Sequence, residues 1–327
     1  MRRREFLSKA IGTAVIQSAA FSVVPAALSA SIAEAQDVAD RQKLVRPMAI
    51  GLKIGLSYDN PENAIARVKE LGVTNCFPSL DDWIGRFSAS GARQLNALFE
   101  KYEVTATSVE VVGPGRLVWD FAEGPSTIGL VPRATRMARM DALKQTSDFA
   151  KLLGVPRVQT HCGFIPENPA DPLYQEAVLA IREVAMHCAA NGQDFLMETG
   201  QETPTTVKRT IMDVNQPNLG VGLDTANLIL YGKANPVDAV EIIGQYVKSV
   251  HAKDGLWPTD PMQLGQEVLI GTGRVDFLKV FSRLYQLGYK GAITIERETS
   301  GPQQIEDVKN EKVYLERILA QVMANQT

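Results

Sequence analysis

The sequence contains 327 residues, of which 45% are hydrophobic and 22% are charged, and its formal net charge is −3. This composition is typical of a soluble globular chain with a sizeable core, and the length permits one barrel or two ordinary domains. A slightly acidic chain argues against nucleic acid or an anionic membrane surface as a partner. The three cysteines, Cys76, Cys162 and Cys188, cannot all pair with one another and form no CxxC motif, so we expect buried free thiols.

Residues 1–35 differ in character from the rest of the chain. Arg3-Arg4-Glu5-Phe6-Leu7 resembles the twin-arginine export motif, and an Ala-rich apolar run over 10–30 leads to the small-residue cleavage site Ala33-Glu34-Ala35. An ordinary secretory signal or a membrane anchor is the alternative, but polar residues and a proline interrupt the run and disfavour a stable membrane span. We predict a signal peptide over 1–35 and a periplasmic or secreted mature chain over 36–327. Cleavage removes four basic and two acidic residues, so the formal net charge changes from −3 to −5.

From about residue 49 onward, apolar runs rich in β-branched residues alternate with segments of helical pattern. Start and stop signals flank several of the helices, for example Asn60 and Pro61 before the first one and Gly72 after it. The predicted strands are 49–56, 73–77, 104–109, 157–161, 194–198, 219–224, 247–251 and 292–296. The predicted helices are 61–71, 90–102, 136–153, 173–190, 203–214, 236–243, 277–287 and 305–323.

Eight strands alternating with eight helices, at a period of roughly 30 residues, predict a single-domain α/β fold, the (β/α)8 TIM barrel. A doubly wound open sheet is the main alternative. Such a sheet normally carries a glycine-rich phosphate loop after its first strand, and Ser57-Tyr58-Asp59-Asn60 is not one. Long loops follow the third and seventh predicted strands, and loops of that length inside a compact domain are often functional.

Four of the predicted strands end in a side chain that can bind a metal ion, namely Glu198, Asp224, His251 and Glu296. A neutral imidazole hydrogen-bonded in the core is the alternative for His251. Ionised carboxylates at the ends of buried strands are costly unless they are paired or bound to a metal. Because the strands of a parallel barrel end at one mouth, we expect a single oxygen-rich site with one nitrogen. Such a set suits Mn²⁺, which we favour, or Co²⁺, Mg²⁺ or Zn²⁺.

Several short motifs occur in a fixed order around these residues: Met197-Glu198-Thr199, Gly222-Leu223-Asp224-Thr225-Ala226-Asn227, Val250-His251-Ala252-Lys253-Asp254, Gly271-Thr272-Gly273-Arg274-Val275-Asp276-Phe277, and Gly288-Tyr289-Lys290-Gly291 leading to Ile295-Glu296. Over about 50–318, the chain resembles the xylose isomerase-like barrel superfamily of sugar isomerases and epimerases. The resemblance implies metal ligands at Glu198, Asp224, His251 and Glu296. It also implies that the two glutamates act as acid and base on opposite faces of a carbohydrate.

The chain departs from the ketose 3-epimerases of that superfamily at two substrate-contacting positions. They carry a His where Asn227 stands and an Arg where Trp257 stands, so we place both residues among the substrate contacts. His161 ends the fourth predicted strand, and we favour a substrate hydrogen bond over a core role for it. Lys253 points to the same side as His251, two residues earlier, and either polarises a substrate oxygen or pairs with a ligand carboxylate.

These residues predict a metal-dependent sugar isomerase or epimerase that abstracts a proton next to a carbonyl group. A hydrolase or lyase of keto-glycosides on the same barrel, or a sugar-binding protein without activity, are the alternatives. The expected partner is a small carbohydrate, with no nucleic acid and no stable membrane span after processing. The sequence leaves a homo-oligomer open.

Overall fold

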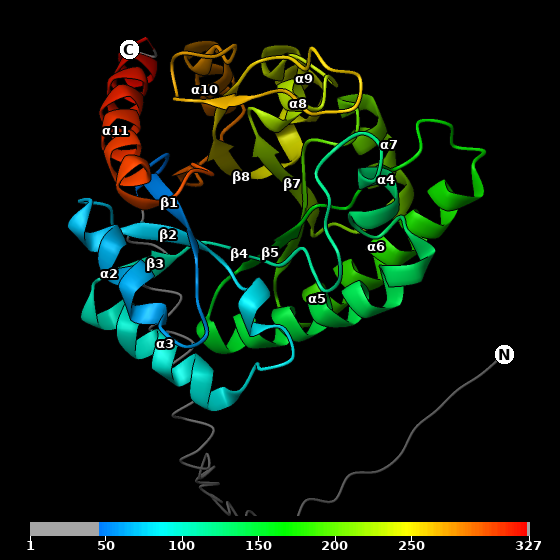
Figure 1. Ribbon diagram of the computed structural model, residues 1–327, viewed down its shortest axis with the longest axis horizontal. Coiled ribbons are helices and arrows are strands. Elements are labelled where there is room, and N and C mark those ends of the chain that lie inside the picture. Colours follow the sequence, from blue (N-terminus) through cyan, green and yellow to red (C-terminus); the bar gives the residue numbers. More distant parts are fainter. Residues whose placement is uncertain (1–45, 326–327) are drawn as a thin grey trace, which may run out of the picture. The chain divides into compact units, whose positions relative to one another are not determined.

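The computed structural model describes residues 46–325, which form a closed barrel of parallel strands surrounded by helices (Figure 1). Neighbouring strands follow the order β1-β11-β8-β7-β6-β5-β4-β2, and β2 pairs again with β1, which closes the ring. The barrel strands are β1 (Ile50–Gly55), β2 (Asn75–Ser79), β4 (Val109–Glu110), β5 (Arg157–Thr160), β6 (Asp194–Glu198), β7 (Leu219–Asp224), β8 (Val247–Ala252) and β11 (Ile293–Ile295). The predicted single-domain TIM barrel is therefore confirmed.

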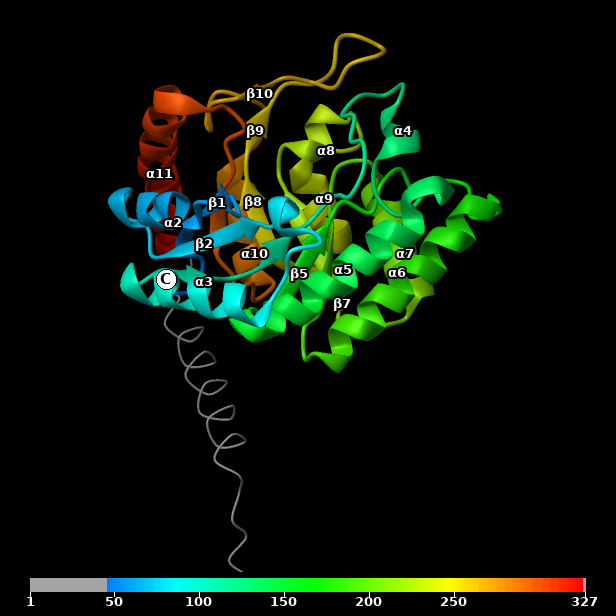
Figure 2. The same cartoon turned by 60° about the horizontal axis from the view of Figure 1, so that its bottom comes forward.

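Long helices follow the strands in turn and cover the outside of the barrel (Figures 1 and 2). They are α2 (Pro61–Glu70), α3 (Ala89–Lys101), α5 (Arg133–Leu153), α6 (Pro172–Ala190), α7 (Pro204–Val214), α9 (Pro236–Ile243), α10 (Phe277–Gln286) and α11 (Gly301–Ala324). The predicted helices agree within a few residues. The last one begins at Gly301 rather than at residue 305, because the polar residues before Ile305 extend it without adding to its apolar pattern.

The third predicted strand, 104–109, is in fact two short pieces, β3 (Thr105–Ala106) and β4. β3 pairs with β2 alone, whereas β4 lies between β2 and β5, so the chain changes partners within the strand. A β-branched pattern favours extended backbone but carries no information about the neighbouring strand, which is why the break was not predicted. The Asn60 side chain also makes no cap hydrogen bond, so Pro61 is the start signal that holds here.

Short elements in the loops were not predicted either. They are η1 (Asp81–Trp83), α4 (Gly124–Thr127), α8 (Asn227–Leu230), η2 (Gly244–Tyr246) and the two-stranded pair β9 (Asp254–Gly255) and β10 (Glu267–Val268). α4, β9 and β10 lie at the same end of the barrel (Figure 2). Single turns of this kind carry too few residues for a periodic signal.

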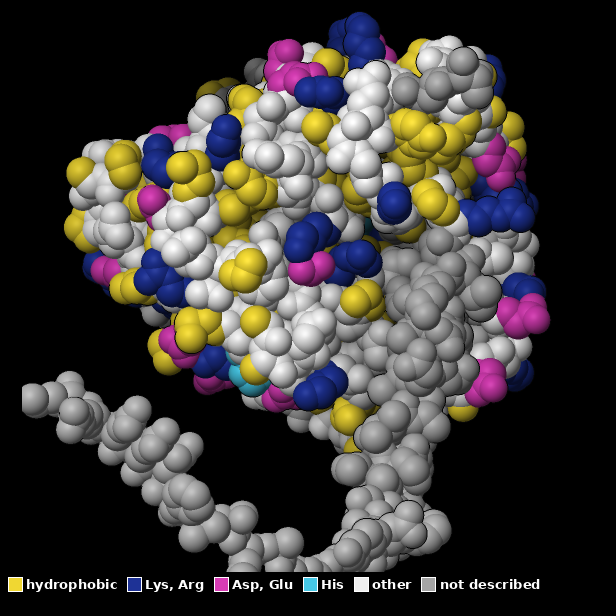
Figure 3. Space-filling model, turned by 180° about the vertical axis from the view of Figure 1, so that it is seen from behind, with side chains coloured by type: hydrophobic (Ala, Val, Ile, Leu, Met, Phe, Trp, Pro, Cys, Tyr) yellow, Lys and Arg dark blue, Asp and Glu magenta, His cyan; other side chains and the backbone are white. Residues whose placement is uncertain are grey.

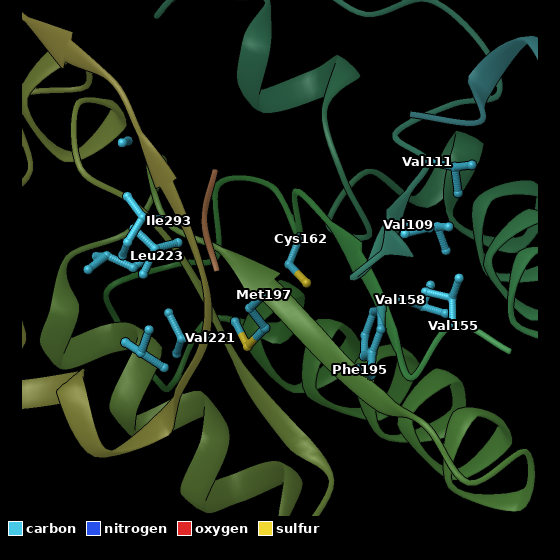
Figure 4. Packing of buried hydrophobic residues seen from close by; sticks show 14 of the residues in the cluster. Val109, Val111, Val155, Val158, Cys162, Phe195, Met197, Val221, Leu223 and Ile293 are labelled. Carbon is cyan, nitrogen blue, oxygen red and sulfur yellow. The ribbon is translucent and has the colours of Figure 1, made fainter. Parts of the chain in front are cut away.

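The strands carry mostly apolar side chains on the face toward the helices, and the opposite face carries polar and small residues together with a few apolar ones, such as Phe77 beside His251. Phe195, Met197, Val221 and Leu223 belong to the buried apolar cluster seen in Figure 4. Because successive residues of a strand face opposite sides, Glu198 ends the other face of its strand. The apolar faces thus bind the helices to the barrel, and the remaining faces are left for polar groups. All three cysteines are buried free thiols, as expected.

Charged side chains of both signs are interspersed on the face shown in Figure 3. None of the helices within residues 46–325 is long and apolar enough to cross a membrane. The predicted signal peptide and its cleavage site lie outside the described residues.

Candidate metal centre

The four predicted ligands converge at the ends of four adjacent barrel strands. Glu198 ends β6, Asp224 ends β7, His251 is the penultimate residue of β8, and Glu296 directly follows β11. Asp224 and His251 are register partners, so their side chains leave the barrel wall at one level. All four are buried, and one donor atom from each lies within 4.8 Å of the others.

The spacing of these donor atoms fits a divalent cation. His251 Nδ1 lies 3.1 Å from Glu198 Oε1 and 3.1 Å from Glu296 Oε2. Neighbouring ligands on one octahedral ion, each at about 2.1 Å, lie about 3.0 Å apart. Asp224 Oδ2 is buried and has no hydrogen-bond partner among residues 46–325, and such an atom is costly unless something else binds it. The donor set and this oxygen both suit a divalent cation.

The ionisation of the cluster is set by competition between burial and neighbouring charge. Burial alone would lower the pKa of His251, but the carboxylates of Glu198 and Glu296 outweigh it and raise this pKa to about 10. Burial raises the pKa of Asp224 well above its ordinary value, although Lys253 opposes the shift. The free cluster therefore retains protons on two of its ligands, and a metal ion would have to displace them.

Polar groups one layer deeper in the barrel hold Glu198 in place. Gln159 Nε2 donates to Glu198 Oε2 over 3.0 Å, and Ser249 Oγ donates to Gln159 Oε1 over 2.6 Å. Gly222 provides the space for this amide, since a Cβ on Gly222 would lie 1.9 Å from Gln159 Oε1. A glycine is thus needed at position 222, two residues before Asp224, for Gln159 to support Glu198.

His161 lies against the cluster, just beyond the end of β5. Its Nε2 is 3.3 Å from Glu198 Oε2, and Gln201 Nε2 is 3.1 Å from its Nδ1. Gln201 in turn donates to the Tyr231 hydroxyl over 3.0 Å. Burial lowers the pKa of His161, which favours the neutral form of the ring. The Trp119 ring packs edge-on against the imidazole at 4.9 Å and is 41% exposed, which marks the way out to solvent.

Lys253 and Asn227 border the cluster on the Asp224 side. Lys253 Nζ lies 2.8 Å from Glu298 Oε1, 3.8 Å from Asp224 Oδ2 and 3.9 Å from Glu296 Oε2. The Asn227 backbone N–H donates to Asp224 Oδ1 over 2.7 Å, and its side-chain oxygen is 3.5 Å from Lys253 Nζ. Both residues are buried, so they belong to the wall of the cluster.

Trp257, the remaining predicted contact, stands apart from the cluster. It lies in the loop between β9 and β10 and is 40% exposed. That loop touches the long loop after the third strand, where Phe121 N donates to Met262 O over 3.2 Å. The fully buried Asp254 anchors the base of the loop by accepting backbone hydrogen bonds from Gly271 and Gly273. Trp257 is therefore a residue of the rim.

Sequence reasoning missed two charged residues inside the barrel, Lys53 on β1 and Glu110 at the end of β4. Lys53 Nζ lies 2.6 Å from Glu296 Oε1 and 3.2 Å from Glu110 Oε1. Burial raises the pKa of Glu110 to about 8, although Lys53 opposes the shift. A signal for Lys53 was present, since it is the one charged residue in the apolar run Ile50-Gly51-Leu52-Lys53-Ile54.

Comparisons with known proteins agree with this geometry. A crystal structure of a xylose isomerase domain protein from Planctomyces limnophilus is 30% identical, with a TM-score of 0.77, and the match covers 85% of this chain and 99% of that one. A xylose isomerase-like TIM barrel protein from Mycobacterium smegmatis, solved in complex with magnesium, is 17% identical over 86% of this chain and 98% of that one, with a TM-score of 0.64. The latter likeness concerns the fold.

Among curated sequences, a putative L-ribulose-5-phosphate 3-epimerase from Haemophilus influenzae is 27% identical over 204 residues, or 59% of this chain. The alignments with it and with an uncharacterised protein from Methanocaldococcus jannaschii span 66% and 58% of those relatives. A profile described as xylose isomerase-like TIM barrel matches residues 65–318. With the closed barrel and its buried Glu-Asp-His-Glu cluster, this match shows that the chain belongs to the xylose isomerase-like TIM barrel family.

Proposed function

We propose that the protein is a metal-dependent sugar isomerase or epimerase that moves a proton at a carbon next to a carbonyl group. The observation that carries this proposal is the buried set of four residues with donor atoms within 4.8 Å of one another, together with Asp224 Oδ2, which has no hydrogen-bond partner among residues 46–325. The epimerase relative and the magnesium bound to the M. smegmatis protein support it. Glu198, Asp224, His251 and Glu296 would hold the ion, and Mn²⁺ remains our first choice.

Glu198 and Glu296 are the proposed acid and base. Each has one oxygen directed into the cluster and the other fixed from outside it: Gln159 binds Glu198, and Lys53 binds Glu296. A divalent cation in the site would stabilise negative charge on the substrate oxygen beside the reacting carbon. The glutamates come from strands separated by β7 and β8, so they approach a bound sugar from different directions. Two such carboxylates can remove a proton on one face and return it on the other.

His161, Asn227 and Lys253 are the proposed substrate contacts within the site, with Trp257 at its rim. Their hydrogen-bonding groups surround the same cluster, and Trp119 offers an aromatic face at the exit. Buried polar groups of this kind favour a polyhydroxylated ligand, because each hydroxyl can replace a lost water contact. A small carbohydrate is the proposed partner.

Proton exchange at the carbon next to the carbonyl tests the proposal. The purified protein is loaded with Mn²⁺, incubated in deuterated water with ketoses with and without a terminal phosphate, and followed by NMR. Glu198→Gln and Glu296→Gln should each lower the exchange rate by on the order of 100-fold or more, with a smaller change in substrate binding. Exchange at the wild-type rate in both variants would exclude them as bases and favour His161 or Lys253. Cleavage of a 3-keto-glycoside without ketose exchange would favour the hydrolase or lyase alternative.

We also propose export through the twin-arginine pathway, with processing between Ala35 and Gln36. The support is the arginine pair, the apolar run and the small-residue site in the sequence. Export of a folded protein suits a site whose metal is bound before transport. Changing Arg3 and Arg4 to Lys should leave the unprocessed chain in the cytoplasm, as measured by cell fractionation. If that variant is exported like the wild type, the twin-arginine assignment is wrong.

A further inference from the structure

Lys53 is an ammonium group inside the barrel with two carboxylate partners from different strands. Its Nζ lies 2.6 Å from Glu296 Oε1 and 3.2 Å from each oxygen of Glu110. The side chains of Glu110 and Glu296 are 4% and 7% exposed, and that of Lys53 is 16% exposed. Removing one partner of a buried ion pair is strongly destabilising, because the remaining charge is left uncompensated. Lys53 is thus a fixed charge of the site.

The carboxylate that Lys53 binds belongs to a second group of residues able to bind metal. Glu110, His161 and Glu198 are all buried, and one donor atom from each lies within 4.8 Å of the others. Glu198 belongs to both groups, so its two oxygens can serve different cations. Glu110 Oε2 is buried and makes no hydrogen bond, although Lys53 Nζ is only 3.2 Å away. By its donor atoms alone, this second group could also bind a divalent ion.

The sum of the formal charges at the site favours one bound divalent ion over two. The carboxylates that face the site are the buried Glu110, Glu198, Asp224 and Glu296, and the ammonium groups beside them are the buried Lys253 and the half-buried Lys53. If metal binding displaces the protons, so that all four carboxylates are ionised and His251 is neutral, these groups leave −2, which one divalent ion neutralises. A second divalent ion would leave a buried excess of +2, and uncompensated charge is costly in a buried site. Without the positive charge of Lys53, the same carboxylates would favour the binding of a second divalent ion.

We propose that Lys53 is the built-in second cation of this site: its ammonium group lies beside Glu110, the carboxylate that a second divalent ion would need together with His161 and Glu198, and its charge excludes that ion. This inference rests on the proposed function only in requiring the first metal site. Lys53 then has a positioning role: it fixes Glu296 Oε1 and leaves Oε2 directed toward His251. The site holds a single exchangeable ion because the other positive charge is covalently part of the chain.

Metal stoichiometry tests the proposal without reference to turnover. The apoprotein is dialysed against Mn²⁺ and the bound metal is measured by elemental analysis. The wild type should bind about one Mn²⁺ per chain, and Lys53→Met should bind about two. Lys53→Arg keeps the positive charge and should bind about one. Lys53→Met with Glu110→Gln loses the second site and should also return to about one.

Electron paramagnetic resonance provides a second readout on the same samples. Two Mn²⁺ ions that share Glu198 would be magnetically coupled, so the six-line spectrum of isolated Mn²⁺ should be lost in Lys53→Met and regained in the double variant. Circular dichroism and thermal unfolding confirm that each variant is folded, and Lys53→Gln, which also removes the charge and should also bind about two Mn²⁺, carries the test if Lys53→Met does not fold.

The outcomes separate this inference from the proposed function. If the wild type and Lys53→Met each bind about one uncoupled Mn²⁺, Lys53 is not a substitute for a metal, although the metal centre stands. If the wild type or Lys53→Arg binds two coupled ions, the ammonium group does not exclude the second ion and the inference is wrong. If the wild type binds no Mn²⁺, Co²⁺, Mg²⁺ or Zn²⁺ at all, the proposed function and the inference both fail.

Discussion

Two glutamates four residues apart, Glu198 and Glu202, are both buried and yet differ in every interaction that matters. Burial alone would raise the pKa of Glu198, but its polar neighbours, chiefly His161 and Lys53, hold this pKa below its ordinary value. Burial raises the pKa of Glu202 to about 8, and neither of its carboxyl oxygens has a hydrogen-bond partner among residues 46–325. One side chain is an ionised member of a cluster, and the other is a neutral acid on its own.

This difference shows that a buried carboxylate becomes a candidate metal ligand when charged and polar groups from several strands lie beside it. Burial alone does not suffice. Each of the two glutamates is followed by a threonine, so the local sequence does not separate them. Glu198 is the last residue of β6 and meets groups from β5 and β8 at the barrel mouth. Glu202 lies past the turn, near Cys162, and its charged neighbours are Lys233 and Glu167.

The largest expected effect on metal binding follows from removing one of the proposed ligands. Asp224→Asn takes a charge from the cluster, so we expect Mn²⁺ affinity to fall by more than the roughly 10–100-fold loss typical of a group that only supports a ligand. Fluorescence or calorimetric titration with Mn²⁺ measures this loss. Asp276→Asn is the matched control, since an asparagine can also cap α10 there, and it should bind Mn²⁺ like the wild type. Wild-type affinity in Asp224→Asn would place the metal elsewhere.

A smaller effect should follow from disturbing the support beneath Glu198. In Gly222→Ala the new Cβ would lie 1.9 Å from Gln159 Oε1, so the amide must move and Glu198 loses its donor. We expect a loss of about 1–3 kcal/mol in the free energy of unfolding and about 10-fold in Mn²⁺ affinity. Urea unfolding measures the free energy of unfolding, and titration with Mn²⁺ measures the affinity.

Gly55→Ala is the control for that substitution. It also replaces a strand glycine, but no atom lies within 4 Å of the added Cβ, so both quantities should stay near their wild-type values. Adding Gln159→Ala to Gly222→Ala should restore part of the stability but not the affinity. Wild-type stability of Gly222→Ala would show that Gln159 is free to move and does not fix Glu198.

The sequence allowed the barrel and the cluster to be predicted because both depend on short-range signals. Strand ends, helix stops and period-two alternation place Glu198, Asp224 and Glu296 at one mouth without knowledge of their partners. Lys53 and Glu110 depend instead on closure of the ring. They meet across β2, and the third strand changes partners just before Glu110. Because Lys53 and Glu110 come from different strands, no pattern within a single strand or helix predicts their contact.

Glu202 itself allows a prediction of how the stability of the protein changes with pH, and the direction of that change is clear. Because its pKa in the folded protein, about 8, lies above the unfolded value, this carboxyl contributes stability that is fully present below the unfolded pKa of about 4.5. That stability is lost as the pH rises through 8, since the folded protein then holds a buried charge. Glu202→Gln cannot ionise and should keep its stability over this window. Relative to the wild type, the variant should gain a few kcal/mol at most on going from pH 5 to pH 8, at about 1.4 kcal/mol per pKa unit.

Urea unfolding at pH 5 and pH 8, with a chelator in all samples, measures this gain while the pH dependence of the shared metal ligands cancels between wild type and variant. The neighbouring Glu167 gives an opposite control. Burial would raise its pKa, but hydrogen bonds from Thr206 and Thr203 lower it, so its ionised form is favoured in the folded protein. Glu167→Gln should therefore lose stability relative to the wild type as the pH rises through the acid range, below pH 5. If Glu202→Gln gains nothing between pH 5 and pH 8, Glu202 is ionised and paired in the folded protein, and it does not differ from Glu198 in the way proposed here.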